Sequence, residues 1–268
     1  MDLSEPKVMG ILNVTPDSFY AGSRKQTDEE IASRAAQIIE EGGHIIDIGA
    51  YSSRPGAQDV APEEEMRRLR NGLELVRRAV GDAVISIDTF RADVAKMCVE
   101  EFGVAIVNDI SGSDMDKNMF PTVAKLGVPY VLMHMQGTPQ NMQTAPHYDD
   151  IVRDVMLYFS ERINRLYSLG AKDIILDPGF GFGKSLQHNY CLLRHMEELQ
   201  MFGLPTLVGI SRKSMIYKLL GGGPEDALGG TVALNAISLM KGADILRVHD
   251  VKACCDTVKI FHQLNAAN

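Results

Sequence analysis

Polar side chains stand at or just beyond the ends of the short apolar runs that recur along this chain. Carboxylate and amide groups can hydrogen-bond the edge of a polar ring, and cationic groups can bind a phosphate or carboxylate. Burying one such group without a partner costs about 1–3 kcal/mol or more, so core packing poorly explains a complete set. Any single member can be a turn former or a helix cap, and only the set indicates a site. The set is Asn13, Asp47, Asp88, Asn108, His134, Asp177, Ser211 with Lys213, and Arg247 with His249.

The apolar runs are expected to be strands of a parallel sheet, because they are apolar nearly throughout, as in sheets covered by helices on both faces. The expected strands are Val8–Asn13, His44–Ile48, Ala83–Asp88, Val104–Asn108, Tyr130–His134, Asp173–Asp177, Leu207–Ile210 and Ile245–His249. Stretches of helical periodicity lie between them, and in Thr27–Glu41 the residues Thr27 and Glu30 also fit a capping box. The other expected helices are Pro62–Val80, Arg91–Phe102, Lys117–Leu126, Tyr148–Leu169, Leu186–Phe202, Ser214–Leu220, Ala227–Lys241 and Val251–Asn265.

The number of these units predicts the fold class. Eight strand–helix units in 268 residues favour a closed (β/α)8 TIM barrel over an open doubly wound sheet. No Pro/Gly/Ser-rich linker marks a boundary, so we expect an α/β fold with a single domain over residues 1–268. In such a barrel the chemistry lies at the carboxyl ends of the strands, which is where the polar set is expected.

The composition restricts the partners. The chain carries 27 Lys and Arg against 35 Asp and Glu, a net charge of −8, so its field repels nucleic acid and acidic membranes. The four cysteines form no CxxC pair and no zinc-ligand spacing, which is typical of a reduced protein. The start of the chain lacks a signal-peptide pattern, and no apolar run approaches the roughly 18 residues of a membrane span. We expect a cytoplasmic protein with no nucleic-acid or membrane partner.

A glycine-rich segment, LDPGFGFGKS, follows the sixth expected strand. A Walker loop would need glycine at Pro178, and a GxGxxG fingerprint from Gly179 would need glycine at Lys184. The segment is therefore expected to be a flexible loop that carries Phe180 and Phe182 over a planar ligand. A glycine turn with two packing phenylalanines is the alternative.

The ends of the seventh and eighth strands suggest an anion site. Ser211 and Lys213 precede a helix start, where backbone N–H groups and the helix dipole favour negative charge. An ordinary serine cap with solvated basic neighbours is equally compatible with the spacing. Arg247 and His249 share a face of their strand and are two potential cations. His134 is expected to be a hydrogen-bonded wall residue instead of a metal ligand.

Taken together, the motifs resemble dihydropteroate synthases, a family of pterin-binding enzymes of folate biosynthesis. They stand in the family's order and span most of the chain. The matching segments are Met9–Phe19, Asp47–Gly56, Ser86–Thr89, Asn108–Ile110, Met133–Pro139, Leu176–Lys184, Ser211–Ser214 and Arg247–Val251.

The resemblance implies a cytoplasmic homodimer that joins 6-hydroxymethyl-7,8-dihydropterin diphosphate to p-aminobenzoate and releases pyrophosphate with Mg²⁺. It further implies a dissociative substitution through a pterin cation. Our hypothesis is that Asp88 and Asp177 stabilise this cation, and that Lys213 and Arg54 complete the catalytic set. The implied pterin-binding residues are Asp88, Asn108, Ile110, Met133, Asp177, Phe182, Lys213 and Arg247. The implied diphosphate-binding residues are Asn13, Arg247 and His249, with Asn13 also the protein ligand of Mg²⁺. The implied p-aminobenzoate-binding residues are Ser53, Arg54, Pro55, Phe182, Ser211 and Lys213.

The sequence departs from the family pattern in its first loops, where Ala21 replaces a common Asp and Tyr51 a common Glu. Three other functions fit parts of the sequence. A pterin-binding methyltransferase would share the Asp/Asn set but would not need the anion site. An aldolase-type lyase would use Lys213 as a Schiff-base former. A ligand-binding barrel without activity is the third alternative.

Overall fold

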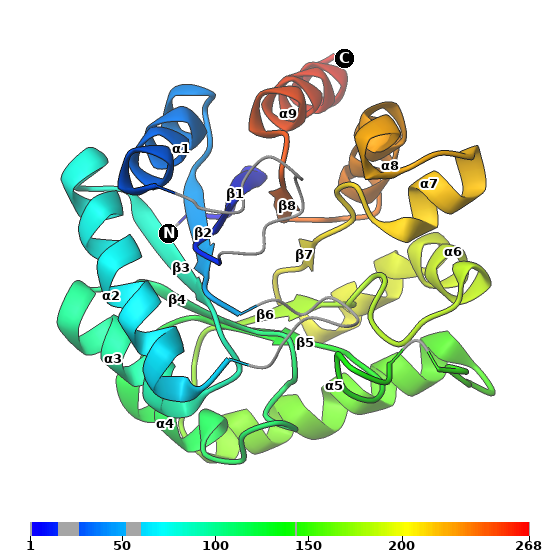
Figure 1. Cartoon of the computed structure of the whole chain (residues 1–268). Helices are drawn as coiled ribbons and strands as arrows, with labels where there is room; N and C mark the ends of the chain where they lie inside the picture. Colours follow the sequence, from blue (N-terminus) through cyan, green and yellow to red (C-terminus); the bar gives the residue numbers. More distant parts are fainter. Residues whose placement is uncertain (1, 16–26, 52–59, 143, 268) are drawn as a thin grey trace.

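The structure is a computed structural model that describes residues 2–15, 27–51, 60–142 and 144–267 (Figure 1). The strands are β1 (Lys7–Asn13), β2 (Ile45–Gly49), β3 (Val84–Asp88), β4 (Ile106–Asp109), β5 (Tyr130–Met133), β6 (Ile174–Asp177), β7 (Leu207–Val208) and β8 (Ile245–Val248). The helices are α1 (Asp28–Glu40), α2 (Pro62–Ala79), α3 (Ala92–Phe102), α4 (Met119–Leu126), α5 (Ile151–Ser168), α6 (Leu186–Arg194), α7 (Ser214–Leu220), α8 (Leu228–Met240) and α9 (Val251–Ala266). Two short 3₁₀ helices, η1 (Met196–Phe202) and η2 (Pro224–Ala227), complete the elements.

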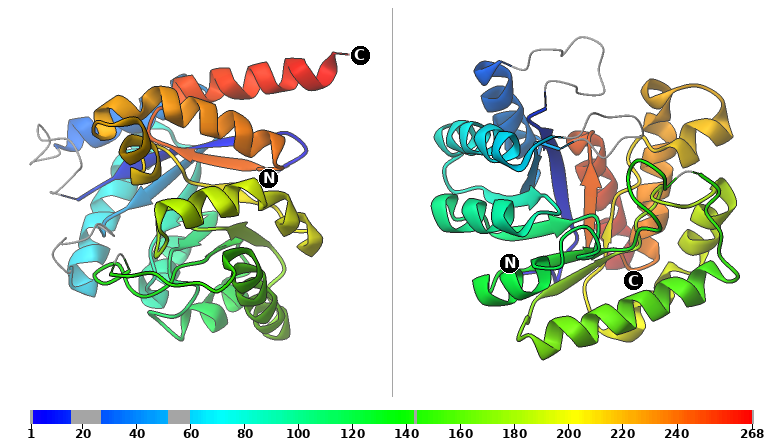
Figure 2. Two further views of the ribbon diagram at one scale, coloured as in Figure 1. Left: turned by 90° about the vertical axis from the view of Figure 1, so that its right-hand side faces the viewer. Right: turned by 60° about the horizontal axis from the view of Figure 1, so that its bottom comes forward.

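The strands form a parallel barrel. Their order is β6-β5-β4-β3-β2-β1-β8-β7, and a parallel bridge between Leu176 and Thr206 joins the two ends of this sheet. The Leu176 N–H also donates to the Pro205 carbonyl at 2.8 Å. The helices lie outside the strands, and α9 runs beside α8 (Figures 1 and 2). The expected TIM barrel is confirmed.

The local elements agree with the sequence pattern with one exception. The capping box of α1 is present, because Glu30 N–H donates to Thr27 Oγ1 and Thr27 N–H donates to Glu30 Oε2. The expected helix over Leu186–Phe202 is wrong, since the chain leaves the α conformation at His195 and continues as η1. Glu198 N–H donates to the carbonyl three residues back, which is the tighter bonding typical of a helix end.

The interior of the barrel has an apolar floor with a polar layer above it. One buried cluster forms the floor from Met9, Ile45, Ile106, Val131, Ile175, Leu207 and Ile245. Residues two positions further along a strand point to the same side. The polar layer therefore consists of Asp47, Ser86, Asn108, Asp177 and Arg247. This alternation is what positions the site.

The outer faces of the strands pack under the helices. Ile46, Ile48 and Ile87 belong to the large core cluster that also contains the buried faces of the surrounding helices. Within the described ranges, no helix combines the length and the apolar character that crossing a membrane requires.

Candidate active site

Arg247 on β8 binds two carboxylates from other strands. Its Nε donates to Asp47 Oδ2 at 2.6 Å, and its Nη2 donates to Asp88 Oδ2 at 2.7 Å. Asn108 Nδ2 also donates to Asp47 Oδ2, at 3.1 Å. Four strands thus bring together residues that are up to 200 positions apart. The result is a connected polar network directly above the apolar floor.

The network concentrates negative charge around one cation. The Asp47 side chain is fully buried, and its Oδ1 has no hydrogen-bond partner in the described part of the chain. Burial raises the pKa of Asp88, the charge of Arg247 opposes that rise, and Asp47 adds to it. Burial alone would lower the pKa of Arg247, but Asp47 and Asp88 raise it. Arg247 is therefore charged, and it is the group that favours the ionised form of Asp88.

Asp177 and Lys213 both bond to the glycine-rich loop and influence each other electrostatically. Asp177 Oδ1 accepts from Gly179 N–H at 2.7 Å, and Lys213 Nζ donates to the Phe180 carbonyl. Burial raises the pKa of Asp177, and the charge of Lys213 opposes that rise. Burial lowers the pKa of Lys213 to about 8, against the charge of Asp177. Each group makes the charged form of the other more favourable.

An apolar wall contains several of the expected pterin-binding residues. The buried side chains of Ile110, Met133, Met135 and Met142 form a cluster, and Phe182 packs against it. The centroid of the Phe182 ring also lies 4.5 Å from Lys213 Nζ. Methionine and aromatic side chains suit the faces of a flat ring, while the polar layer offers donors and acceptors for a ring edge.

His249 contacts Ser211 at the end of β8. Its Nδ1 and its backbone nitrogen both lie 3.1 Å from Ser211 Oγ. Burial lowers the pKa of His249 to about 4, and Arg247 contributes to this shift. Of the two potential cations at the end of β8, Arg247 is therefore the one whose charge the folded site favours. Ser211 is not a simple helix cap, because its hydroxyl faces His249.

Of the remaining expected site residues, the structure describes some and leaves others outside its described ranges. Asn13 ends β1, in register with Gly49. Ser53, Arg54, Pro55 and Ala21 lie outside the residues that the structure describes.

His134 is a buried wall residue whose Nδ1 lies 2.9 Å from Lys184 Nζ, so the interpretation as a hydrogen-bonded side chain is confirmed. The described residues contain no cluster of three or more His, Cys, Asp or Glu side chains that could hold a metal ion.

Two polar residues of the site region were not singled out from the sequence. Ser86 lies in register with Asp47, and its buried Oγ has no partner among the described residues. Its position two residues before Asp88 is the signal that could have found it. Lys184 ends the glycine-rich motif, and its side chain is buried behind the loop.

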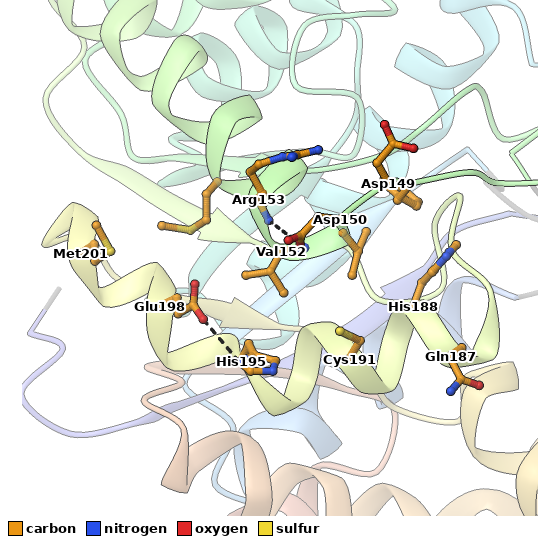
Figure 3. A pocket seen from close by; sticks show the side chains of 13 residues that line it. Asp149, Asp150, Val152, Arg153, Gln187, His188, Cys191, His195, Glu198 and Met201 are labelled. Carbon is orange, nitrogen blue, oxygen red and sulfur yellow. Dashed lines mark hydrogen bonds and ion pairs between the residues drawn. The ribbon is translucent and has the colours of Figure 1, made fainter.

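A groove on the outer wall is separate from these residues. It lies between the start of α5 and the helices α6 and η1, and Figure 3 shows Cys191, His195 and Glu198 along one side of it. His195 Nδ1 pairs with Glu198 Oε1 at 3.3 Å. None of the expected site residues lines this groove.

Comparison with known proteins settles the family. A family model described as "Pterin binding enzyme" matches residues 9–249. The dihydropteroate synthase of Escherichia coli (strain K12) is 45% identical over 262 residues, which is 97% of this chain and 92% of that protein. The chain belongs to the dihydropteroate synthase family of pterin-binding enzymes. The resemblance stated from the motifs is confirmed.

Other relatives agree in sequence and in structure. The dihydropteroate synthase of Haemophilus influenzae is 41% identical over 263 residues, covering 97% of this chain and 94% of that protein. The Yersinia pestis dihydropteroate synthase, solved with a sulfonamide drug complex, superposes with a TM-score of 0.94 at 42% identity, covering 100% of this chain and 97% of that one. The Xanthomonas albilineans enzyme in complex with 7,8-dihydropteroate gives a TM-score of 0.87 at 37% identity, covering 100% and 97%. The protein is a transferase of the dihydropteroate synthase type.

Proposed function

We propose that the polar layer of the barrel binds the pterin of 6-hydroxymethyl-7,8-dihydropterin diphosphate, which the protein joins to p-aminobenzoate with release of pyrophosphate. The observation that carries this proposal is the set of charged and amide groups directly above the apolar floor. Asp88, Asn108, Asp177 and Lys213 supply donors and acceptors for the pterin edge. Ile110, Met133 and Phe182, with the stem of Arg247, enclose the ring faces. A site built on buried polar groups rejects analogues that leave those groups unpaired.

The carboxylates account for a dissociative substitution. In the proposed reaction the C–O bond at the pterin methylene breaks first and leaves a cation that delocalises into the ring. Asp88 and Asp177 stabilise that cation, because fixed negative charge in a water-poor site needs no reorganisation during the reaction. Arg247 and Lys213 support this role, since each faces one of these buried carboxylates and favours its ionised form. The aromatic amine of p-aminobenzoate is already a nucleophile at neutral pH and needs no strong base.

We assign p-aminobenzoate to the rim of the barrel. Ser211 and the start of α7 would bind its carboxylate, and Phe182 with the Lys213 stem would enclose its ring. The contact between Lys213 and the Phe182 ring supports this enclosure. Ser53, Arg54 and Pro55 would close the site after the diphosphate binds, with Arg54 in the catalytic set.

The leaving diphosphate is assigned to Asn13, Arg247 and His249. Arg247 supplies positive charge, and His249 supplies a neutral ring nitrogen as a hydrogen-bond donor. Mg²⁺ fits Asn13 as a single oxygen ligand, because this ion prefers substrate phosphates and water to an all-protein cage. When bound, Mg²⁺ would neutralise charge on the departing diphosphate.

The family resemblance also leads us to propose a cytoplasmic homodimer. Large apolar side chains that are exposed on α7, α8 and α9 support a contact with a second copy: Leu219, Leu220, Leu228, Met240, Ile260 and Leu264. Light scattering should give the mass of a dimer for the wild type and that of a monomer for Ile260→Glu. Lys259→Glu, which changes the charge at the adjacent position, should leave the dimer intact. A monomeric wild type would contradict the proposal.

Pyrophosphate release from the purified protein tests the function directly. The assay contains pterin diphosphate, p-aminobenzoate and Mg²⁺, and each component is omitted in turn. We expect sustained pyrophosphate release and dihydropteroate formation only when all three are present. Absence of release from the complete mixture, or turnover at the same rate without p-aminobenzoate, would contradict the proposal.

A further inference from the structure

The glycine-rich loop after β6 is held from behind by a buried ammonium group. Lys184 is 3% exposed, and its Nζ donates to the carbonyls of Gly179 at 2.9 Å, Phe182 at 3.0 Å and His134 at 3.2 Å. His134 Nδ1 lies at 2.9 Å from the same nitrogen. Three carbonyl acceptors require three N–H donors, which an ammonium has and a neutral amine does not. The three carbonyl acceptors and the charge of Asp177 favour the ammonium form of Lys184, while burial and the charge of Lys213 oppose it by lowering the pKa of this group.

The backbone of this loop depends on close packing that only glycine allows. Gly179 has φ +67°, and a Cβ there would lie 2.0 Å from the His134 carbonyl oxygen. Gly183 has φ +60°, and a Cβ there would lie 2.4 Å from the Gln136 carbonyl oxygen. The loop consequently lies directly on the chain that follows β5, and Lys184 bonds to both segments.

A second buried side chain fixes the same loop. Asn189 at the start of α6 is 3% exposed, and its Oδ1 accepts from Gly181 N–H at 2.7 Å. Its Nδ2 donates to the carbonyls of Ser185 at 2.7 Å and Lys184 at 3.3 Å. Between Gly179 and Ser185, Lys184 and Asn189 thus bind backbone groups of five residues: Gly179, Gly181, Phe182, Lys184 and Ser185.

This network ends on groups of the proposed pterin site. Gly179 accepts from Lys184 through its carbonyl and donates through its N–H to Asp177 Oδ1. Phe182, whose carbonyl Lys184 also binds, packs against the apolar wall. Phe180, between them, accepts from Lys213. We therefore expect a change at Lys184 to displace Asp177, Phe182 and Lys213, the three groups that the proposed function places at the pterin.

We propose that Lys184, supported by Asn189, is a positioning residue that holds the glycine-rich loop in its binding shape and keeps a buried positive charge next to Asp177. The inference rests on the proposed function, because it assigns Asp177 and Phe182 to the pterin. Three cations face the Asp177 carboxylate from the elements packed against it: Lys213 after β7, Arg247 on β8 and Lys184 behind the loop. His134, which also contacts Lys184, is neutral because burial and Lys184 lower its pKa far below the usual value.

The charge of Lys184 allows its positioning role to be tested by the pH dependence of pterin binding. Removal of Lys184 takes one of three cations away from Asp177, so the pKa of this carboxyl rises further in the variant. Protonation of Asp177 removes an acceptor from the pterin site. The pH below which pterin diphosphate binding weakens should therefore be higher in Lys184→Met than in the wild type. A role confined to stability would lower the melting temperature and leave this pH unchanged.

The experiment measures equilibrium binding of pterin diphosphate to the full-length protein between pH 5 and 9 by calorimetry, after confirmation that the wild type turns over. Lys184→Met should bind pterin diphosphate between about 10- and 100-fold more weakly at pH 8, as expected when ligand-facing groups are misplaced. Its loss of affinity at low pH should also begin at a higher pH than in the wild type. Asn189→Ala should weaken binding in the same direction without the shift, because it changes no charge. Thr257→Val, which removes a hydrogen bond inside α9, is the matched control and should bind like the wild type.

The outcomes separate this inference from the function itself. A wild type without turnover contradicts the proposed function. A wild type with turnover and a folded Lys184→Met that has unchanged affinity and an unchanged acid limb overturns the inference alone. If Lys184→Met does not fold, Asn189→Ala decides: weaker pterin binding supports the positioning role, and wild-type binding refutes it.

Discussion

Replacing Arg247 by methionine removes the one cation that bonds to both Asp47 and Asp88 among the described residues. Asp47 is fully buried, and Arg247 and Asp88 are only 20% and 22% exposed, so solvent screens these contacts weakly. Breaking a buried ion pair by removing one partner costs about 3–5 kcal/mol, because the remaining charge has no compensation. We expect a loss of this size in the free energy of unfolding at pH 8.

The loss should depend on pH in a defined direction. In the variant Asp88 keeps the burial that raises its pKa and loses the opposing charge of Arg247, so this carboxyl has a higher pKa in the native state than in the unfolded chain. Between these two pKa values the native state binds more protons, and stability rises as the pH falls, by about 1.4 kcal/mol per pH unit for one carboxyl. The difference from the wild type should therefore shrink between pH 8 and pH 5.

Urea unfolding followed by circular dichroism at several pH values measures this difference. Lys252→Met, which breaks the surface pair with Asp256, is the control and should show no comparable loss at any pH. A loss for Arg247→Met below about 1 kcal/mol, or one of equal size at pH 5 and pH 8, would refute the electrostatic reasoning.

Three further predictions concern the reaction. Asp88→Asn should bind pterin diphosphate within about tenfold of the wild type but lower kcat by about 100-fold, because a neutral amide cannot stabilise the cation; a wild-type kcat in a variant that binds would refute this role. In steady-state assays, kcat/KM should fall as the pH rises through about 8, because the Lys213 ammonium is lost there. In Lys213→Arg this fall should occur at higher pH. A fall at the same pH in both proteins would contradict the assignment of this pKa to Lys213. Chelation should stop pyrophosphate release until Mg²⁺ is restored, and Asn13→Ala should raise the Mg²⁺ concentration for half-maximal rate about tenfold; the same Mg²⁺ requirement in both proteins would exclude Asn13 as a ligand.

The barrel could be predicted because its strands are buried on both faces. Runs such as Ile45–Gly49 and Ile174–Asp177 are short and apolar except for one carboxylate, Asp47 in the middle of the first run and Asp177 at the end of the second. The same alternation that puts Ile45 in the floor puts Asp47 in the polar layer, so strand and site follow from one pattern. Closure was not visible, since it depends on a bridge between Leu176 and Thr206 at a strand of only two residues.

Pairing and protonation within the site could not be predicted from spacing. Nothing near Asp47 in the chain indicates that Arg247 binds it, because the contact forms only when the barrel closes. The neutral state of His249 depends on burial beside a cation, which is a property of the folded site. Lys184 belongs to a glycine-rich motif whose sequence does not indicate a role for it. Only the fold shows that its side-chain nitrogen is surrounded by carbonyl oxygens.

The central claim of the mechanism is that the C–O bond of the pterin diphosphate breaks on the carboxylate face before the amine attacks. Positional isotope exchange tests it most directly, with an isotopically labelled bridging oxygen, the wild-type protein and Mg²⁺, in the absence of p-aminobenzoate. We expect the label to move into non-bridging positions of the recovered substrate, and Asp88→Asn to slow this exchange. Full turnover by a wild type that shows no exchange would contradict it.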